Sequence, residues 1–383
     1  MRVAFIGIKG LPSRGGAERV VEALVTRMPG LGIHPVVYCD RKHTAPDFSI
    51  PGVDLVRLPA LAGKHLRMTS LDLLSALHAV GAGRCDLAHL HNVEASFVLP
   101  LLRLRYPVVA TSHGSAYWRA KWGPLARRLI RAMDWPFATW STVATAVSEK
   151  DARDLGARFG REVAYIPNGV GVEYQPDKER ARALLEVHGL ADQGYFVFVA
   201  GRIEPTKGAH LAIEAVNRLS PGVPLLVVGD DLQVPAYGRA LREAAGPQIR
   251  FQPLVEDPAV LFGLMAGARA LVFPSLVEAM SMVLLEGAAL GLPIVCSDLP
   301  ENRAVLGDAA LYFESGNSDS LRRELERALD EPQRLSVMSA KARERALSDF
   351  SWDAITSRYV QIYRQVLLDE VAARSRGAAK RDA

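Results

Sequence analysis

The sequence predicts an α/β protein built from two doubly wound, Rossmann-like domains. Its 383 residues exceed the size of one ordinary domain and suit two domains of roughly 170–200 residues. Short apolar runs alternate with longer helix-like segments along almost the whole chain. Because most of these runs are continuously apolar, they are typical of parallel strands that helices cover on both faces.

The runs expected to form strands fall into two groups. In the first half of the chain they cover 2–8, 35–39, 53–58, 86–91, 107–112, 142–147 and 163–166. In the second half they cover 195–201, 223–229, 249–252, 270–274, 293–297 and 309–313. Strands that are separated by a helix form right-handed βαβ units, so each group predicts one parallel sheet.

The division between the two domains is expected after the last strand of the first half. The segment PNGVGVEYQP is dense in Gly and Pro, and we place a hinge over 168–176. The expected domains are 1–170 and 171–351. Apolar residues at helical spacing predict a helix over 352–373 that packs back on the first domain. The polar, basic end, 374–383, is expected to be a flexible tail.

Composition limits the class of protein. Lys and Arg number 46 against 42 Asp and Glu, an excess too small to indicate a nucleic-acid partner by itself. The cysteines Cys39, Cys85 and Cys296 form no CxxC pair, which favours a reduced interior. The opening MRVAFIGIKG lacks the sections of a signal peptide, and no stretch reaches the roughly 18 apolar residues of a membrane span. We therefore expect a cytoplasmic protein, bound at most at the inner face of the cell membrane.

Two candidate site features follow strands of the first half. Ligands of open parallel sheets bind beyond the carboxyl ends of the strands. Gly15 and Gly16 follow the first strand, and their backbone N–H groups could approach a phosphate at a helix N-terminus. A tight turn explains them as well. His113 ends the run 107–112, where it would donate to a sugar hydroxyl or to developing charge. A purely structural bond to the backbone is the alternative.

A pair of cations follows the first strand of the second half. Arg202 and Lys207 stand in the motif VAGRIEPTKG. A guanidinium fork and an ammonium at a strand end suit a diphosphate leaving group. The alternative is two solvated surface cations.

The stretch FPSLVEAMSMVLLEGAALGLPIVCSD is the most informative part of the sequence. Glu278 is expected in the loop after the strand 270–274, and Glu286 on the helix that follows. Carboxylates that face a ligand accept hydrogen bonds from vicinal hydroxyls, so one could bind the sugar and the other a ribose. Backbone N–H groups near Met282 and Val283 could bind phosphate. A solvated helix face explains Glu278 more easily than Glu286, which lies in an otherwise apolar helix.

Taken together, these motifs resemble the retaining GT-B glycosyltransferases of family four, over nearly the whole chain. The glycine pair, PNGV, GRIEPTKG, the two spaced glutamates and GLPIVCSD carry the resemblance. It implies that the first domain binds the acceptor and the second binds a nucleotide-sugar donor across a cleft. It further implies that Arg202 and Lys207 hold the diphosphate and Glu286 the ribose. Glu278 would then bind the transferred sugar, with His113 assisting near that sugar.

One departure affects the choice of sugar. Family members often have glycines after the first glutamate, whereas Ala279, Met280 and Ser281 follow here. The opening IGIKGLPSRGGAE resembles bacterial rhamnosyl and related surface-polysaccharide transferases. We therefore expect transfer of a hexose or deoxyhexose to a glycan or a lipid-linked glycan.

The expected chemistry uses neither a metal nor a cofactor. The donor half has no DxD-like motif with further ligands, and no carboxylate pair is placed as nucleophile and acid. We expect front-face transfer that retains the anomeric configuration. His89 and His91 share a strand face, where a structural role is favoured over a metal pair. Two alternatives to a transferase stay open: a nucleotide-sugar epimerase of this fold and a non-catalytic nucleotide-sugar-binding subunit. A NAD-dependent oxidoreductase is disfavoured, because it would need a glycine fingerprint that this sequence lacks.

The segment 117–142 suggests contact with a membrane. It holds four tryptophans among an excess of basic residues: Trp118, Trp122, Trp135, Trp140, Arg119, Lys121, Arg127, Arg128 and Arg131. Basic amphipathic segments with tryptophan bind anionic membrane surfaces, where a polyprenyl-diphosphate-linked acceptor would lie. The alternative is that the tryptophans fill the interior of the first domain.

Overall fold

The computed structural model describes residues 1–13, 15–63, 66–114, 123–171, 175–190, 194–220, 222–231 and 234–379. The chain forms two compact units. The first unit comprises Met1–Asn168 with Trp352–Ala383, and the second comprises Gly169–Ser351. The boundary after Asn168 lies inside the segment where the sequence places a hinge, of which 172–174 fall outside the described residues.

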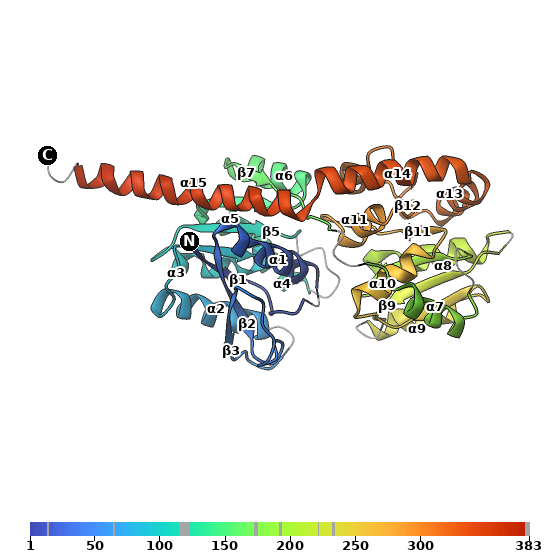
Figure 1. Ribbon diagram of the computed structural model, residues 1–383, viewed down its shortest axis with the longest axis horizontal. Helices are drawn as coiled ribbons and strands as arrows, with labels where there is room; N and C mark the ends of the chain where they lie inside the picture. The colour runs from blue at the N-terminus through green and yellow to red at the C-terminus, as the bar shows by residue number, and fades with distance from the viewer. Residues whose placement is uncertain are drawn as a thin grey trace. The chain divides into compact units, whose positions relative to one another are not determined.

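The first unit contains a parallel seven-stranded sheet in the order β3-β2-β1-β4-β5-β6-β7 (Figure 1). Its strands are β1 (Arg2–Ile6), β2 (His34–Asp40), β3 (Asp54–Leu58), β4 (Leu87–His91), β5 (Val108–Ser112), β6 (Val143–Ala146) and β7 (Val163–Tyr165). The strand order reverses between β1 and β4, and this switch point is where open α/β sheets bind ligands.

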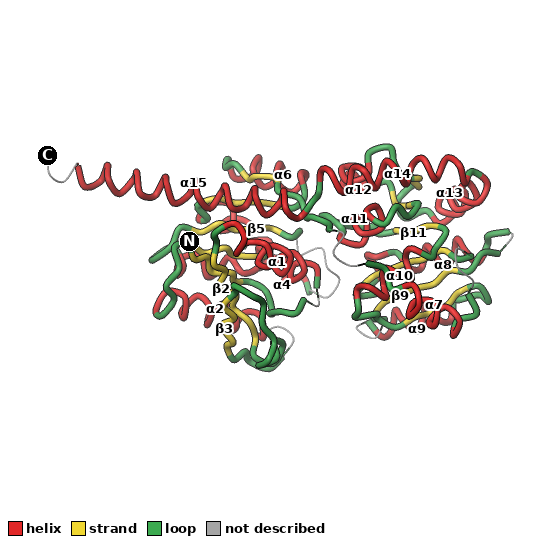
Figure 2. The backbone as a smooth tube through the Cα atoms, in the orientation of Figure 1, coloured by secondary structure: helices red, strands yellow, loops and turns green. Residues whose placement is uncertain are grey.

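Helices cover this sheet, as Figure 2 shows in red. They are α1 (Gly16–Arg27), η1 (Met28–Leu31), α2 (Leu66–Gly81), η2 (Val93–Val98), α3 (Leu99–Leu102), α4 (Pro124–Ala132), α5 (Asp134–Trp140), α6 (Glu149–Phe159) and α15 (Trp352–Ala379). All residues of β4 and β5 are buried. Their side chains therefore had to be apolar on both faces, apart from the polar ones that find buried partners.

The second unit contains a six-stranded parallel sheet in the order β10-β9-β8-β11-β12-β13. Its strands are β8 (Phe196–Ala200), β9 (Leu225–Gly229), β10 (Ile249–Gln252), β11 (Ala270–Phe273), β12 (Ile294–Ser297) and β13 (Leu311–Phe313). Its helices are α7 (Lys178–Val187), η4 (Pro205–Lys207), α8 (Ala209–Asn217), α9 (Pro235–Glu243), α10 (Pro258–Ala266), α11 (Met282–Ala289), α12 (Pro300–Leu306), α13 (Ser318–Asp330) and α14 (Pro332–Asp349). Here the switch point lies between β8 and β11.

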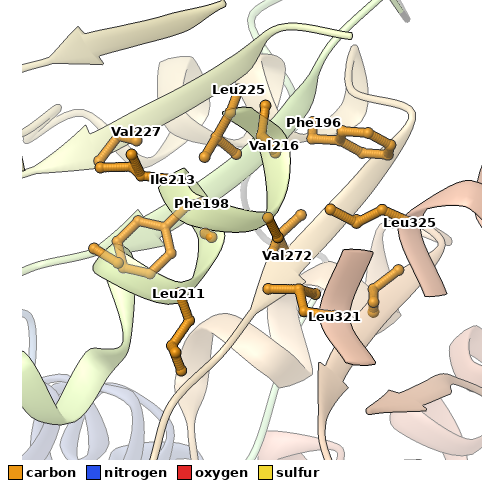
Figure 3. Packing of buried hydrophobic residues seen from close by; sticks show 14 of the residues in the cluster. Phe196, Phe198, Leu211, Ile213, Val216, Leu225, Val227, Val272, Leu321 and Leu325 are labelled. Carbon is orange, nitrogen blue, oxygen red and sulfur yellow. The ribbon is translucent and has the colours of Figure 1, made fainter. Parts of the chain in front are cut away.

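Strands and helices of the second unit share one apolar core (Figure 3). Side chains of β8, β9 and β11 meet those of α8 and α13, including Phe196, Phe198, Val227, Val272, Leu211, Ile213, Leu321 and Leu325. Full burial of one such side chain contributes about 1.5–3 kcal/mol. This core fixes the strand ends that carry the candidate site.

The α/β fold class expected from the sequence is confirmed, and every expected strand is present with small differences at its ends. The C-terminal helix α15 packs on the first unit: Tyr359 and Tyr363 are buried there, and Arg27 Nε lies 2.9 Å from Asp353 Oδ1. The helix end expected at residue 373 is wrong, because α15 continues to Ala379. Alanine and arginine favour helix and no proline interrupts this segment; residues 380–383 of the expected tail lie outside the described residues.

Candidate active site

The loop after β8 is held against the end of β11 by a glycine. Gly208 ends η4 with a φ of 71°. A Cβ added to it would lie 2.0 Å from the carbonyl oxygen of Pro274, a separation that no side chain tolerates. Glycine alone permits both the conformation and the approach. The motif GRIEPTKG therefore brings Lys207, the residue before this glycine, to the switch point of the second sheet.

Lys207 and Glu278 form an ion pair across the two central strand ends. Lys207 follows β8 and Glu278 follows β11, and Nζ lies 2.6 Å from Oε1. The Glu278 side chain is only 9% exposed. A charge-assisted hydrogen bond of this length orients both groups. The structure thus brings together the cation and the carboxylate that the sequence assigns to diphosphate and sugar.

The helix after Glu278 carries the remaining predicted residues of the second unit. Ser281 caps α11, and its hydroxyl accepts a hydrogen bond from the Leu284 N–H at 3.4 Å. Met282 and Val283 form the first turn, whose free N–H groups give the helix end a positive potential. Glu286 lies on the same helix and is buried.

Arg202 is half-buried in the loop after β8. It precedes Lys207 in the same loop, so the two predicted cations share one connection between strand and helix. The neighbouring strand end is fixed by side-chain bonds that the sequence analysis did not single out. Ser297 at the end of β12 donates to the carbonyl of Ser275 at 2.5 Å, and Asn302 Nδ2 donates to the carbonyl of Ser297 at 2.9 Å.

In the first unit, the glycine pair begins α1 as expected. Gly15 is its N-cap with extended backbone, and a Cβ on Gly16 would meet nothing within 4 Å. The carboxylate of Glu18 lies 3.6 Å from the position of a Cβ on Gly15. A carboxylate in the first turn is itself favoured by the positive helix end. Phosphate binding by Gly15 and Gly16 stays a prediction, and a phosphate there would meet this acid.

His113 follows β5 and is paired with a second histidine. Its Nε2 lies 2.9 Å from Nδ1 of His91, the last residue of β4. Parallel register aligns His91 with Thr111, so His113 lies two residues further along the neighbouring strand. From the sequence, a structural role was favoured for His91 over a metal pair with His89, and a bond to His113 was not predicted. The sequence shows that both histidines stand at strand ends, but their hydrogen bond depends on the register between β4 and β5, which the sequence does not show.

His89 joins the C-terminal helix to the sheet. Its Nδ1 lies 2.6 Å from the hydroxyl of Tyr363 on α15, and its Nε2 lies 2.7 Å from the hydroxyl of Thr111. Burial lowers the pKa of His89 and of His91 well below the usual value, so both rings are neutral. The buried tyrosines of α15 therefore complete a polar network beneath the candidate site.

Within the part of the chain that the structure describes, no group of three His, Cys, Asp or Glu side chains could hold a metal ion. None of the described helices is long and apolar enough to cross a bilayer.

The segment 117–142 is described only from residue 123 onward, so Trp118 and Trp122 lie outside the described residues. Trp135 and Trp140 of α5 are 49% and 39% exposed and contact each other edge to face. The interior role considered for these two side chains is therefore wrong, because neither is enclosed by the core. On α4, only Ile130 is buried.

Two family models match successive parts of the chain. "Glycosyltransferase Family 4" matches residues 14–174, and "Glycosyl transferases group 1" matches residues 181–345. The chain belongs to glycosyltransferase family 4. It is accordingly a glycosyltransferase, and each of its two units corresponds to one of these models.

The similarity to individual proteins covers nearly the whole length of this chain. A phosphatidyl-myo-inositol mannosyltransferase of Mycolicibacterium smegmatis is 28% identical over 100% of this chain and 98% of its own length. The sucrose-phosphate synthase of Thermosynechococcus elongatus has a similar structure, with a TM-score of 0.79, 22% identity and coverage of 96% and 99% of the two chains. HepE of Anabaena, solved with UDP and glucose, has a TM-score of 0.77 and 18% identity, and the match covers 95% of this chain and 100% of HepE. These structural likenesses show that the fold is GT-B.

Proposed function

We propose that this glycosyltransferase moves a hexose or deoxyhexose from a nucleotide-diphosphate sugar to a glycan or lipid-linked glycan, with retention and without a metal. The contact between Lys207 and Glu278 at the switch point of the second sheet carries the proposal. A cation beside a carboxylate matches a donor that presents a diphosphate next to sugar hydroxyls. The Anabaena relative was solved with UDP and glucose, which supports a donor of this class.

In the proposed reaction, Arg202 and Lys207 stabilise the negative charge that develops on the leaving diphosphate. The N-terminus of α11 adds N–H groups and positive potential at Met282 and Val283. Glu278 accepts hydrogen bonds from the transferred sugar, and Glu286 from the ribose. A phosphate oxygen takes the proton of the acceptor hydroxyl as the new glycosidic bond forms on the face that the diphosphate leaves. Positioning and electrostatics then provide most of the rate enhancement.

Binding of the sugar donor is tested by thermal shift with UDP-, GDP- and dTDP-sugars and the free diphosphates, in the absence of divalent metal. A ligand at about 100 times its Kd stabilises the folded state by about 2.7 kcal/mol. One responsive base is expected. Absence of any shift for the folded protein would contradict the donor site. Incubation of the responsive sugar without acceptor separates transfer from the epimerase alternative, which would convert the sugar alone.

We propose further that the acceptor is reached at a membrane surface through the region of α4 and α5. Leu125 and Leu129 of α4 are 73% and 60% exposed and are four residues apart, so they share one helix face. Arg127, Arg128 and Arg131 are exposed beside them. Exposed leucine, tryptophan and arginine together suit an anionic lipid surface. The mycobacterial relative is named for a lipid substrate, which supports this acceptor class.

Co-sedimentation with vesicles tests the membrane contact. Binding to vesicles with anionic lipid is expected, with a fall at high salt because the arginine contribution is screened. Leu125→Ser with Leu129→Ser should weaken binding at least about tenfold, since each leucine loses on the order of 1.5–3 kcal/mol of burial. The matched control is Leu104→Ser, which is equally exposed on the same unit. Equal binding of the wild type to neutral and anionic vesicles would contradict the proposal.

A further inference from the structure

A pocket of about 590 Å³ opens on the first unit, at the edge of the sheet opposite the candidate site. Its lining includes Thr142, whose N–H group donates to the carbonyl of Val108 at the start of β5, and Arg161, which shortly precedes β7. His113 follows the other end of β5, and a five-residue strand spans roughly 16 Å. The pocket has the volume of a small-molecule site and is separate from the strand ends where transfer is proposed.

Two arginine side chains line this pocket. Arg103 Nη1 donates a hydrogen bond to Oγ1 of Thr142, which also accepts one from the N–H group of Val108 at 2.9 Å. These bonds orient the guanidinium of Arg103 and leave the hydroxyl proton of Thr142 available as a donor. Arg161 forms no ion pair or side-chain hydrogen bond with another described residue. Guanidinium forks in a pocket suit a carboxylate or a phosphate group.

A carboxylate from the C-terminal helix shares the pocket with the two arginines. Glu370 of α15 is half-buried, and no cation of the described ranges forms an ion pair with it. The acid therefore does not neutralise the arginines and can accept hydrogen bonds from a ligand. A simple anion gains from the two guanidinium groups but is repelled by this carboxylate. A ligand that carries hydroxyl groups besides its anionic group satisfies both kinds of residue.

Trp140 adds a flat apolar surface to the same pocket. It is 39% exposed and contacts Trp135 edge to face, with ring centroids 4.9 Å apart, and this contact restricts the orientation of the indole. One face of a pyranose ring consists of C–H groups and is apolar, so covering an aromatic side chain stabilises the bound ring. Hydroxyl groups and an anionic substituent at the rim of the ring can then reach the polar residues of the pocket.

We propose that this pocket binds an acidic sugar residue, a pyranose ring that carries a carboxylate or a phosphate group. Arg103 and Arg161 hold the anionic group. Glu370 accepts hydrogen bonds from the ring hydroxyls, and the ring lies against Trp140. A sugar bound here is remote from the end of β5 where His113 lies, so it is not the sugar that is transferred. The pocket gives the first unit a second binding site, one for an acidic glycan.

Saturation-transfer NMR and calorimetric titration of the full-length protein test this binding site. The probes are methyl glucuronide and glucose 6-phosphate, and the one that binds more tightly identifies the anionic group. Methyl glucoside, which lacks that group, should bind at least about tenfold more weakly, because its charged hydrogen bonds are lost. Glycerol phosphate, which lacks the ring, should also bind more weakly. Equal affinity for glycerol phosphate would overturn the proposal in favour of an anion site such as a lipid headgroup occupies, and absence of saturation transfer to both acidic sugars would overturn it as well.

Variants locate the bound sugar. Arg161→Ala should weaken binding of the acidic sugar at least about tenfold. The matched control is Arg153→Ala, an exposed arginine on α6 of the same unit that does not line the pocket. Unchanged binding by Arg161→Ala would place the sugar elsewhere and overturn the proposal.

Two further variants separate recognition of a sugar from recognition of an anion. Trp140→Ala should weaken binding of the acidic sugar and leave glycerol phosphate unaffected, because only the sugar has a ring to cover the indole. Glu370→Ala should also weaken binding of the acidic sugar. Tighter binding by Glu370→Ala would show that the pocket recognises only the anionic group and would contradict the proposal. Since the probes contain no nucleotide and no transfer is measured, these outcomes do not depend on the proposed function.

Discussion

Lys207 is the single side chain on which the proposed chemistry depends most. Its ammonium lies 2.6 Å from Oε1 of Glu278, and this hydrogen bond orients the cation. Lys207→Ala should lower kcat by on the order of 10²–10³, as the loss of one transition-state hydrogen-bond donor does. Steady-state transfer assays test this, with Lys341→Ala, an exposed lysine of the same unit, as the control. Near-normal turnover of Lys207→Ala would remove this residue from the mechanism.

Gly208 should be as sensitive as the charged residues, although it has no side chain. Gly208→Ala places a Cβ 2.0 Å from the carbonyl oxygen of Pro274 at a φ of 71°, so the loop that carries Lys207 must move. We expect donor affinity to fall at least tenfold and unfolding to be easier by about 1–3 kcal/mol. Calorimetric titration and thermal melts measure the two effects. Gly201→Ala is the matched control, because a Cβ there meets nothing within 4 Å; equal effects of both changes would refute the steric argument.

Residue patterns single out the candidate carboxylates and cations more clearly than they single out the contact between the two histidines. Glu286 in an apolar helix and Lys207 before a glycine are visible as local anomalies of the sequence. The bond between His91 and His113 is not, because it requires the parallel register that aligns His91 with Thr111. Nor does the glycine pair reveal that the carboxylate of Glu18 lies beside the start of α1.

At the level of elements, the strands were predictable because burial on both faces permits almost only apolar side chains. The end of α15 was not, since a solvated helix end has no apolar pattern to mark it. Beyond Val366 no described residue of α15 is buried, so propensity alone extends the helix to Ala379. The break between α4 and α5 is also not predictable from the apolar runs, because these mark strands and not the ends of helices.

The docking of α15 should depend on the hydroxyl of Tyr363. Tyr363→Phe leaves Nδ1 of His89 without its partner at 2.6 Å in a fully buried position. The expected loss is about 1–3 kcal/mol of unfolding free energy, measured by urea denaturation. Tyr359→Phe is the control, because its hydroxyl stands 3.3 Å from Thr111, which keeps its bonds to His89 and Thr145. A loss for Tyr359→Phe equal to that for Tyr363→Phe would mean that the bond to His89 is not what holds the helix.

For the whole molecule, the two units should respond differently to pH because their buried titratable groups differ. His89 and His91 of the first unit have pKa values well below 6.5, with burial as the main cause. The unfolded chain therefore binds protons there that the folded chain does not, and folding stability falls as the pH drops below about 6.5. Each site contributes about 1.4 kcal/mol per pH unit.

Asp72 of the same unit acts in the opposite direction. Burial, with a further contribution from Glu94, raises its pKa from 3.8 to about 8. The folded state then binds a proton that the unfolded state releases, so this group favours unfolding as the pH rises toward 8. Below pH 6.5 the two histidines outweigh it, with a net loss of about 1.4 kcal/mol per unit. The stability of the first unit should therefore be greatest near pH 6.5.

Differential scanning calorimetry between pH 5 and 8 tests this balance. The transition of the second unit is identified by its shift with the nucleotide that the donor screen selects, because only a state that binds ligand is stabilised. The other transition should reach its highest Tm near pH 6.5 and decline on both sides. In Asp72→Asn the decline above pH 6.5 should disappear, while the acid decline remains and steepens. A first-unit transition that keeps the same pH dependence in wild type and variant would show that Asp72 is not the group that limits stability toward pH 8.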